Sequence, residues 1–366
     1  MQNRRNYNQD NSVDMYSFSS STQSQGRKKG RNKKRVWTNI ISSLVLVACI
    51  ASMGYIALYT PLFAEGRRDD GFERVEQSRE GLSYFLVLGI DECGLTDLMM
   101  VLKMDHDNDT GALLQIPRDL FVGAEVATGG TGKVNAVYPA ARAGETNVNA
   151  VKRVVNQYLG LPIDHHIILQ LDGFRNIVDA VDGVPIYLER QMMVTNEFTP
   201  VPYPIGPGDI VLNGLDAESF VRHRRSFATG DLGRMESQRH FMIAFAQRIQ
   251  TMSGRQTLSV AQSSFGQVST SLTIRNMLSY VGEVRDLDLD NIFVAAVPGQ
   301  SGTFTPSGFR FARSYFSIHK QDYVDLINEH FLPPDKQVTI YDLRIQELHT
   351  RRAPSQTFDP GTMADD

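Results

Sequence analysis

The chain has 366 residues, a formal net charge of −4 and a hydrophobic share of 42%, which is ordinary for a folded protein. This length allows one large or two medium domains. The two cysteines, Cys49 and Cys93, are far apart in different surroundings, which argues against a disulfide-stapled fold. Stability must therefore come from packing.

Residues 1–35 are predicted to be a disordered, basic tail. They are rich in Asn, Gln and Ser and end in a Lys/Arg cluster at 27–35. Residues 36–63 have no charged side chain, and such a stretch spans a hydrocarbon core of about 30 Å. We therefore predict one transmembrane helix. The positive charge before it places the tail in the cytoplasm and the rest of the chain outside.

Two other interpretations of this N-terminal region fit its sequence less well. A cleaved signal, including a lipoprotein signal at Cys49, would end its apolar run sooner, whereas this run continues to Leu58. The basic cluster alone would also suit nucleic acid. Directly before a membrane span, membrane topology or lipid headgroups explain it better, so no nucleic-acid partner is expected.

The remainder of the chain predicts a charged spacer at 64–81, one domain at 82–345 and a disordered tail at 346–366. Within the domain, short apolar runs alternate with helical periods, which is typical of an α/β fold (α+β layered) with a central mixed sheet flanked by helices. Strands are predicted at 84–89, 98–104, 112–116, 166–171, 184–188, 291–297 and 338–341. Helices are predicted at 148–159, 174–181, 215–221, 231–250, 274–284 and 322–331.

Three connecting segments stand out in this pattern. The Asp-rich segment 105–111 lacks the Gly and Glu of an EF-hand loop, so it predicts a hairpin turn more strongly than a calcium site. The proline-rich segment 191–212 predicts a long loop, and such loops are often functional. The segment 253–264 predicts a polar break between two helices.

The predicted helix 231–250 begins with polar residues on its inward stripe. Arg234 and Gln238 share that stripe with the apolar residues that follow. Burying a guanidinium and an amide without partners is costly, so an anion is expected there, and the positive end of the helix dipole favours one. The alternative is surface ion pairing of these arginines with Glu218 and Glu236.

Charged residues also gather at the ends of predicted strands, where α/β sheets place their ligands. Asp91 follows the first strand and Asp97 precedes the second. Two carboxylates on a brief loop suit Mg²⁺, which completes its octahedron with water and phosphate oxygens. Asp residues at such junctions also make turns, and this alternative stays open.

Cations cluster at the same predicted edges. The set comprises Arg118, Lys133, Arg222, Arg224 and Arg234. Guanidinium forks and a metal would neutralise a pyrophosphate while charge grows on its bridging oxygen. The alternatives are an ion pair between Arg118 and Asp119 and a solvated loop lysine at position 133.

Short motifs occur in a fixed order along this outer domain, at 86–91, 96–100, 116–119, 133–138, 172–174, 181–184, 212–214 and 220–239. By these motifs, residues from about 82 to 333 resemble the LytR-CpsA-Psr family, membrane-anchored enzymes that attach anionic glycopolymers to bacterial cell walls. Each motif alone is weak, but the ordered set is specific. The sequence departs from the family pattern between Asp91 and Asp97, where the loop is shorter and Glu92-Cys93 replaces an Arg.

The resemblance implies a reaction in the bacterial cell membrane, with the catalytic domain extracellular. A polyprenyl-pyrophosphate-linked glycopolymer, of teichoic acid or capsular polysaccharide type, would be transferred to peptidoglycan. A phosphodiester link would form and polyprenyl phosphate would be released. The donor lipid would lie in an apolar pocket, and whether the apolar residues 241–249 line that pocket or the core stays open.

By motif match, the resemblance also implies residue roles. The pyrophosphate would be held by Arg118, Lys133, Arg222, Arg224, Arg234 and Gln238. Mg²⁺ would be held by Asp91 and Asp97, and the catalytic residues would be Arg118, Arg234 and, as a candidate general base, Asp119. The competing functions are a non-catalytic polyprenyl-phosphate-binding scaffold or regulator, and a hydrolase of the polyprenyl pyrophosphate.

Overall fold

The computed structural model describes residues 81–196, 198, 201–224, 231–286, 289, 292–348 and 357–358. Within these ranges, no helix combines the length and the apolar character that a membrane crossing requires. The predicted transmembrane helix at 36–63 lies outside the described residues, as do the predicted basic tail and nearly all of the spacer.

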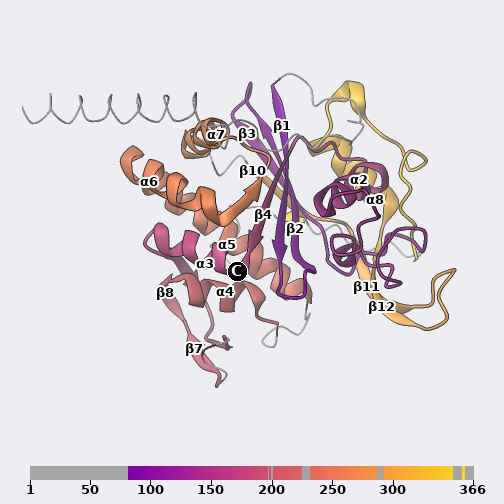
Figure 1. Cartoon of the computed structure of the whole chain (residues 1–366), viewed down its shortest axis with the longest axis horizontal. Helices are drawn as coiled ribbons and strands as arrows, with labels where there is room; N and C mark the ends of the chain where they lie inside the picture. The colour runs from indigo at the N-terminus through magenta and orange to yellow at the C-terminus, as the bar shows by residue number, and fades with distance from the viewer. Residues whose placement is uncertain are drawn as a thin grey trace, which may run out of the picture. The chain divides into compact units, whose positions relative to one another are not determined.

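A seven-stranded mixed sheet forms the centre of the described fold, as predicted (Figure 1). Its strands lie in the order β13, β10, β3, β2, β1, β4 and β9. Their bounds are β1 (Leu82–Ile90), β2 (Thr96–Asp105), β3 (Thr110–Gln115), β4 (His165–Gln170), β9 (Val268–Thr270), β10 (Ile292–Ala296) and β13 (Thr357–Phe358). Strands β1, β2 and β3 form an antiparallel meander, while β4 is parallel to β1 and β10 is parallel to β3. The predicted hairpin at 105–111 is therefore confirmed.

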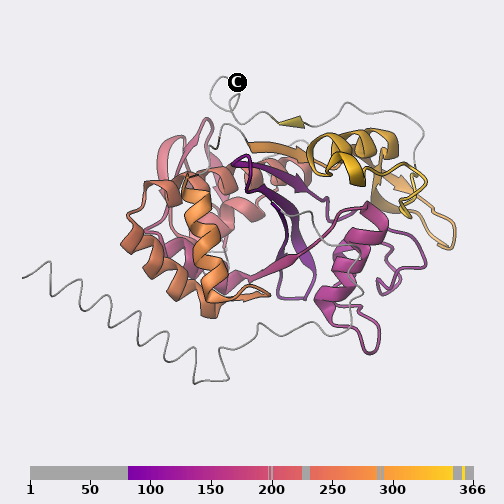
Figure 2. The same cartoon turned by 90° about the horizontal axis from the view of Figure 1, so that it is seen from above.

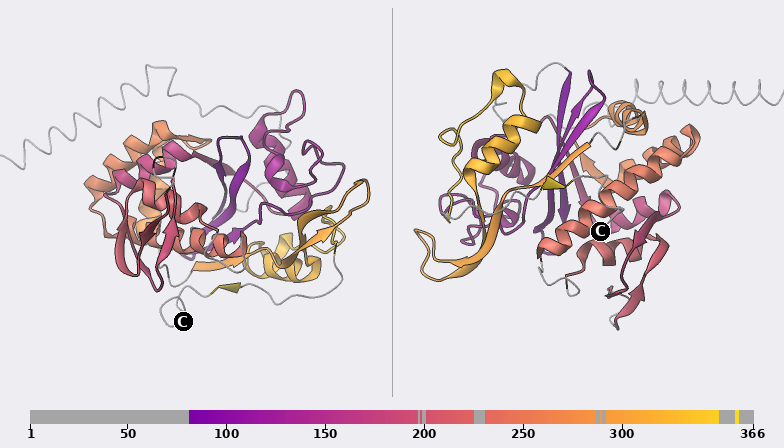
Figure 3. Two further views of the ribbon diagram at one scale, coloured as in Figure 1. Left: turned by 90° about the horizontal axis from the view of Figure 1, so that it is seen from below. Right: turned by 180° about the vertical axis from the view of Figure 1, so that it is seen from behind.

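Helices cover both faces of this sheet (Figure 2). Their bounds are α2 (Asn147–Leu159), α3 (Leu171–Ala180), α4 (Gly214–Arg222), α5 (Asp231–Thr251), α6 (Gly254–Ser264), α7 (Ile274–Asp286) and α8 (Lys320–His330). Helices α2 and α8 pack on one face, and α5 and α7 place side chains on the other. The two groups lie on opposite sides of the sheet in both views of Figure 3.

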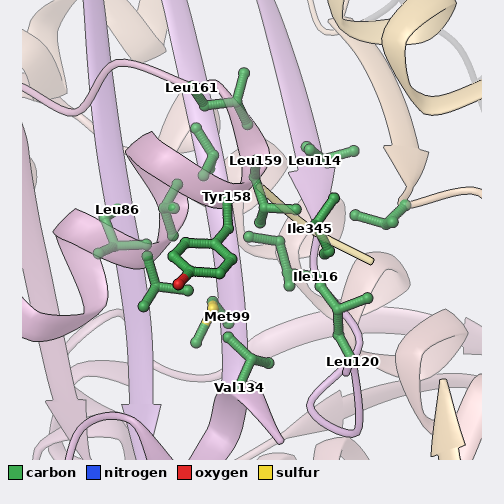
Figure 4. Packing of buried hydrophobic residues seen from close by; sticks show 14 of the residues in the cluster. Leu86, Met99, Leu114, Ile116, Leu120, Val134, Tyr158, Leu159, Leu161 and Ile345 are labelled. Atoms are coloured by element: carbon green, nitrogen blue, oxygen red, sulfur yellow. The ribbon is translucent and has the colours of Figure 1, made fainter. Parts of the chain in front are cut away.

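The main core fills the α2 and α8 side of the sheet. Alternate residues of β1 and β2, including Leu86 and Met99, pack there against Tyr158 and Leu159 of α2 (Figure 4). Because side chains alternate across a strand, every second residue of β1 and β2 instead faces α5 and α7. The C-terminal end of the domain also contributes to this core, because Ile345 is buried within it.

A second core lies among helices α3 to α6 and two small hairpins. The hairpins pair β5 (Val184–Leu188) with β8 (Gly208–Leu212) and β6 (Met192–Val194) with β7 (Tyr203–Ile205). Phe241 and Ile249 of α5 are buried in this second core, and Phe245 packs against it. Of the two alternatives that periodicity left open for 241–249, the structure shows core packing for these three residues, while Met242 faces the sheet.

Three secondary-structure predictions were wrong, and one hairpin had no prediction. The segment 191–212 contains β6, β7 and β8, whose shortness and prolines concealed their alternation. The segment 253–264 is largely helix α6, which buries only a narrow stripe of small residues. The predicted strand 338–341 is irregular, because the Asn328 side chain hydrogen-bonds the backbone of Val338. A hairpin of β11 (Gly299–Phe304) and β12 (Arg313–Ile318) was missed.

Two residues of the predicted disordered tail also pair with the sheet. Thr357–Phe358 form β13 at its edge, opposite Val294 and Ala295 of β10. Part of the tail therefore carries regular structure, although its composition gave no sign of it.

Candidate functional site

A β-bulge places Asp97 at the end of the sheet. Ile90 pairs with Thr96 and Gly89 pairs with Leu98, so Asp97 has no partner across the β1–β2 ladder. Bulges of this kind redirect side chains and are common beside active sites. Asp97 thus projects from the edge that the sequence pattern indicated.

Arg118 contacts Asp97 from a loop whose backbone is held on two sides. The Arg118 Nη1 atom donates to Asp97 Oδ1 at 2.6 Å. The Arg118 carbonyl accepts from the backbone N–H of Asn135, and the neighbouring Asp119 carbonyl accepts from Phe316 on β12. The alternative pairing of Arg118 with Asp119 is therefore not the one observed.

Two further guanidinium groups approach the same carboxylate. Arg234, with 2% of its side chain exposed, places Nη1 3.6 Å from Asp97 Oδ1, and its Nη2 donates to the Asp97 carbonyl. Arg224 Nη2 lies 3.8 Å from the same oxygen. Three positive charges thus surround one negative charge. The cluster has a net positive charge, which attracts a further anion.

The charges around Asp97 determine its ionisation. Burial by itself raises the pKa of this carboxyl group, but the three guanidinium groups and the hydrogen bond from Arg118 outweigh it. The pKa of Asp97 therefore lies below its usual value.

Acid titration should reveal this ion cluster. A folded-state pKa below the unfolded value of about 3.9 means that Asp97 stabilises the fold above pH 4 and that this stabilisation is lost as pH falls through the folded pKa. We expect the difference in free energy of unfolding between the wild-type chain and Asp97→Asn to shrink as pH is lowered from 5 to 3. Urea unfolding at several pH values measures it, and a difference that stays constant across this range would contradict the ion cluster.

Lys133 and Asp119 form a separate pair beside the cluster. Lys133 Nζ lies 3.0 Å from Asp119 Oδ1 and 5.9 Å from the centre of the Tyr315 ring. About a fifth of the Lys133 side chain is exposed. The alternative of a solvated loop lysine is wrong, and the proposed base Asp119 already has a cationic partner.

Arg222 lies on a different carboxylate. Its Nη1 atom donates to Glu218 Oε1 at 2.7 Å, one helical turn earlier on α4, and Arg175 approaches the other Glu218 oxygen at 3.2 Å. The alternative of ion pairing with Glu218 is thus confirmed for Arg222, while Arg234 is buried against Asp97 instead. The role predicted for Arg222 stays a prediction.

Gln238 belongs to a buried hydrogen-bond chain that sequence reasoning missed. Its Oε1 accepts from Gln115 Nε2 at 2.8 Å, and Gln115 Oε1 accepts from Arg239 Nη1 at 3.2 Å. The Gln238 Nε2 atom donates to the Val221 carbonyl at the end of α4. This chain ties α5 to the segment that carries Arg222 and Arg224. The sequence contained one sign of this chain, because Gln115 is a polar residue at an inward position of an apolar strand.

Asp91 makes a turn. Its Oδ1 atom accepts from the backbone N–H groups of Cys93 at 2.9 Å and Leu95 at 2.8 Å. In the ranges that the structure covers, no three His, Cys, Asp or Glu side chains come together as a metal site. Of the predicted ligands, Asp97 and Asp91 supply two carboxylates, a donor set that suits Mg²⁺ when phosphate oxygens and water complete its shell.

These features define a three-layer α/β domain with an arginine-rich anion site at one end of its sheet. The LytR_cpsA_psr family model matches residues 62–331. The chain belongs to this family.

Curated relatives carry a common name. A protein of Bacillus mycoides (strain KBAB4), named polyisoprenyl-teichoic acid–peptidoglycan teichoic acid transferase TagU, is 30% identical over 207 residues, which cover 56% of this chain and 62% of that protein. A protein of the same name from Bacillus cereus (strain AH820) is 32% identical over 191 residues, which cover 50% and 58%. The chain thus spans about three-fifths of the length of these relatives.

Solved structures show the same fold. The crystal structure of Bacillus subtilis TagV superposes with a TM-score of 0.59 at 23% identity, covering 70% of this chain and 100% of that one. A structure described as TagT bound to LIIa-WTA gives a TM-score of 0.55 at 18% identity, covering 72% and 94%.

Proposed function

We propose that this protein transfers a polyprenyl-pyrophosphate-linked anionic glycopolymer to peptidoglycan and releases polyprenyl phosphate. The observation that carries the proposal is the gathering of Arg118, Arg224 and Arg234 around Asp97 in a domain of this family. The names of the relatives support teichoic acid as the polymer class. The predicted transmembrane helix would keep the enzyme beside a donor whose lipid end stays in the bilayer.

The arginine cluster suits the chemistry of this transfer. The acceptor hydroxyl oxygen would bond to the phosphorus that bears the glycan, and the bond from that phosphorus to the bridging oxygen would break. Negative charge grows on the bridging oxygen, where guanidinium groups fixed in advance stabilise it more than flexible donors do. Arg118 and Arg234 fit this role, because both already lie against a carboxylate oxygen that a phosphate oxygen can replace.

Mg²⁺ is proposed as a cofactor that Asp97 would hold, with Asp91 as a second ligand. When bound, it would neutralise phosphate oxygens and help the leaving group depart. Asp97 has one carboxylate oxygen, Oδ1, directed at the arginines. The general base is assigned to Asp119 as a proposal, which requires Lys133 to release it during the reaction.

An apolar strip on the sheet offers a place for the donor lipid. It consists of Val87, Leu98, Met100, Leu102, Leu113, Ile167, Met242, Ile292 and Val294. Five of these, Leu98, Leu102, Ile167, Met242 and Ile292, are only half-buried although they lie between the sheet and α5. The strip begins at Leu98, next to Asp97, so a prenyl chain on it would start where its pyrophosphate meets the arginines.

Reconstitution tests the transfer directly. The full chain would be incubated with a lipid-linked glycan, peptidoglycan fragments and Mg²⁺, and the products separated by mass spectrometry. We expect glycan bound covalently to the acceptor through a phosphodiester, and less of it when EDTA is present. Glycan phosphate released equally without acceptor would identify a hydrolase, and tight binding without turnover would identify a scaffold; either result overturns the proposal.

A further inference from the structure

The apolar strip ends in a group of polar side chains that the proposed reaction does not use. This end cluster consists of Ser83, His106, His165, Tyr280 and Glu283. Ser83 Oγ lies 2.8 Å from His106 Nε2, and His106 Nδ1 lies 2.7 Å from Glu283 Oε2. The Tyr280 hydroxyl lies 3.2 Å from Ser83 Oγ and 3.4 Å from His165 Nε2.

Strand register places the end cluster on the same face as the strip. Ser83 lies an even number of residues from Phe85, Val87 and Gly89, so all four face α5 and α7. Phe85 packs with Met104 and Leu272 in a small apolar group that shares Leu102 and Ile167 with the strip. Apolar packing is therefore continuous from the half-buried Leu98, beside the arginines, to the buried Met104, which pairs with Ser83.

The two ends of this surface lie at opposite ends of β1. The described chain enters the sheet at Leu82, whereas the turn with Asp91 and the bulge with Asp97 lie at the other end of β1. Gly89 lies six positions after Ser83, which corresponds to about 20 Å along a strand. An isoprene unit adds four carbon–carbon bonds, or about 5 Å when extended, so the surface matches about four units.

The end cluster has the residue types of an acyl-transfer triad, but its surroundings favour a structural role. Ser83 lies within a paired strand, is 8% exposed and has its hydroxyl held by both His106 and Tyr280. A nucleophilic serine instead stands on a turn with donors aimed at the substrate oxygen. The cluster joins β1 and the turn after β2 to α7.

We propose that the end cluster closes the lipid-binding strip and sets how much of the donor's prenyl chain the domain binds. About four isoprene units next to the pyrophosphate lie on the strip, and the rest of the chain lies outside the domain. Ser83 is buried, so an apolar chain that passed it would break the hydrogen bonds of its hydroxyl with His106 and Tyr280 and leave polar atoms facing hydrocarbon, which opposes further insertion. This inference rests on the proposed function of the site.

Binding of prenyl pyrophosphates of increasing length tests the inference. For the full chain, isothermal titration would use geranyl, farnesyl, geranylgeranyl and heptaprenyl pyrophosphate, which carry two, three, four and seven isoprene units. We expect Kd to fall more than tenfold from two to four units, because each unit buries apolar surface. Beyond four units Kd should change less than twofold.

The double variant His106→Leu/Glu283→Leu replaces both polar side chains, so that neither is left without its hydrogen-bond partner. It should bind heptaprenyl pyrophosphate at least fivefold more tightly than the wild-type chain does, with the Kd for geranyl pyrophosphate unchanged. The matched control, Glu145→Leu/Arg153→Leu, removes an ion pair beside α2 on the other side of the sheet. Its Kd should depend on prenyl chain length as the wild-type Kd does, with less than a twofold change beyond four units.

The outcomes separate this inference from the proposed function. A wild-type affinity that keeps rising beyond four units, or a double variant with the wild-type plateau, overturns the inference while the pyrophosphate site stands. If the chain binds none of these compounds, or if Arg118→Ala binds them as tightly as the wild type, the proposed function fails instead.

Discussion

Replacing Arg118 by alanine is expected to lower the rate of glycan transfer by about 100- to 1,000-fold, the effect of removing one preorganised donor from a developing charge. Arg118 Nη1 lies 2.6 Å from Asp97 Oδ1, so its guanidinium is already held in the site that we propose for the phosphate oxygens. The backbone hydrogen bond from Asn135 to the Arg118 carbonyl fixes this direction before substrate arrives. The loss should appear in kcat, because charge on the bridging oxygen grows in the transition state.

A graded series gives this prediction its controls. Arg118→Lys keeps the charge but loses the bidentate fork, so it should recover part of the rate. Arg153→Ala removes an arginine of similar exposure that pairs with Glu145, and it should transfer glycan at the wild-type rate. Thermal unfolding of each variant confirms the fold. An Arg118→Ala protein with normal stability and normal kcat would show that the arginine cluster is not the catalytic site.

Much of the fold and the location of the site were predictable from local patterns. Short apolar runs predicted the central strands, and charged residues at the ends of those runs predicted the edge of the sheet that carries the candidate site. Both signals depend only on residues that are close in sequence. The polar stripe of α5 also indicated a buried arginine, and Arg234 is buried. Short strands such as β6 escaped prediction, since three residues are too few to show a period.

The partners of Arg118 and Asp119 were not predictable, in contrast to the pairing of Arg222 with Glu218 one helical turn away. Arg118 stands beside Asp119 in sequence, yet it contacts Asp97, 21 residues earlier, and Asp119 takes Lys133 instead. Such choices depend on how the loop after β3 packs against β12, which no local pattern encodes. The same holds for the end cluster, where Ser83 and Tyr280 are 197 residues apart.

Neutralising Asp97 is expected to destabilise the domain by about 2 to 3 kcal/mol, somewhat less than breaking a fully buried ion pair, because a fifth of the Asp97 side chain is exposed. In Asp97→Asn, Arg118, Arg224 and Arg234 would repel one another without the carboxylate between them. Urea unfolding measures this loss. Asp119→Asn is the matched control and should cost about 1 kcal/mol or less, because Asp119 faces one cation, Lys133, where Asp97 faces three.

Inorganic pyrophosphate extends this test to the ligand. Because an anion can replace the missing carboxylate among the three guanidinium groups, added pyrophosphate should stabilise Asp97→Asn more than it stabilises the wild-type chain. The experiment needs no lipid, acceptor or metal, so it reports on the arginines alone. Equal stabilisation of the two proteins would mean that phosphate binds elsewhere, and that the arginines around Asp97 form a structural ion cluster.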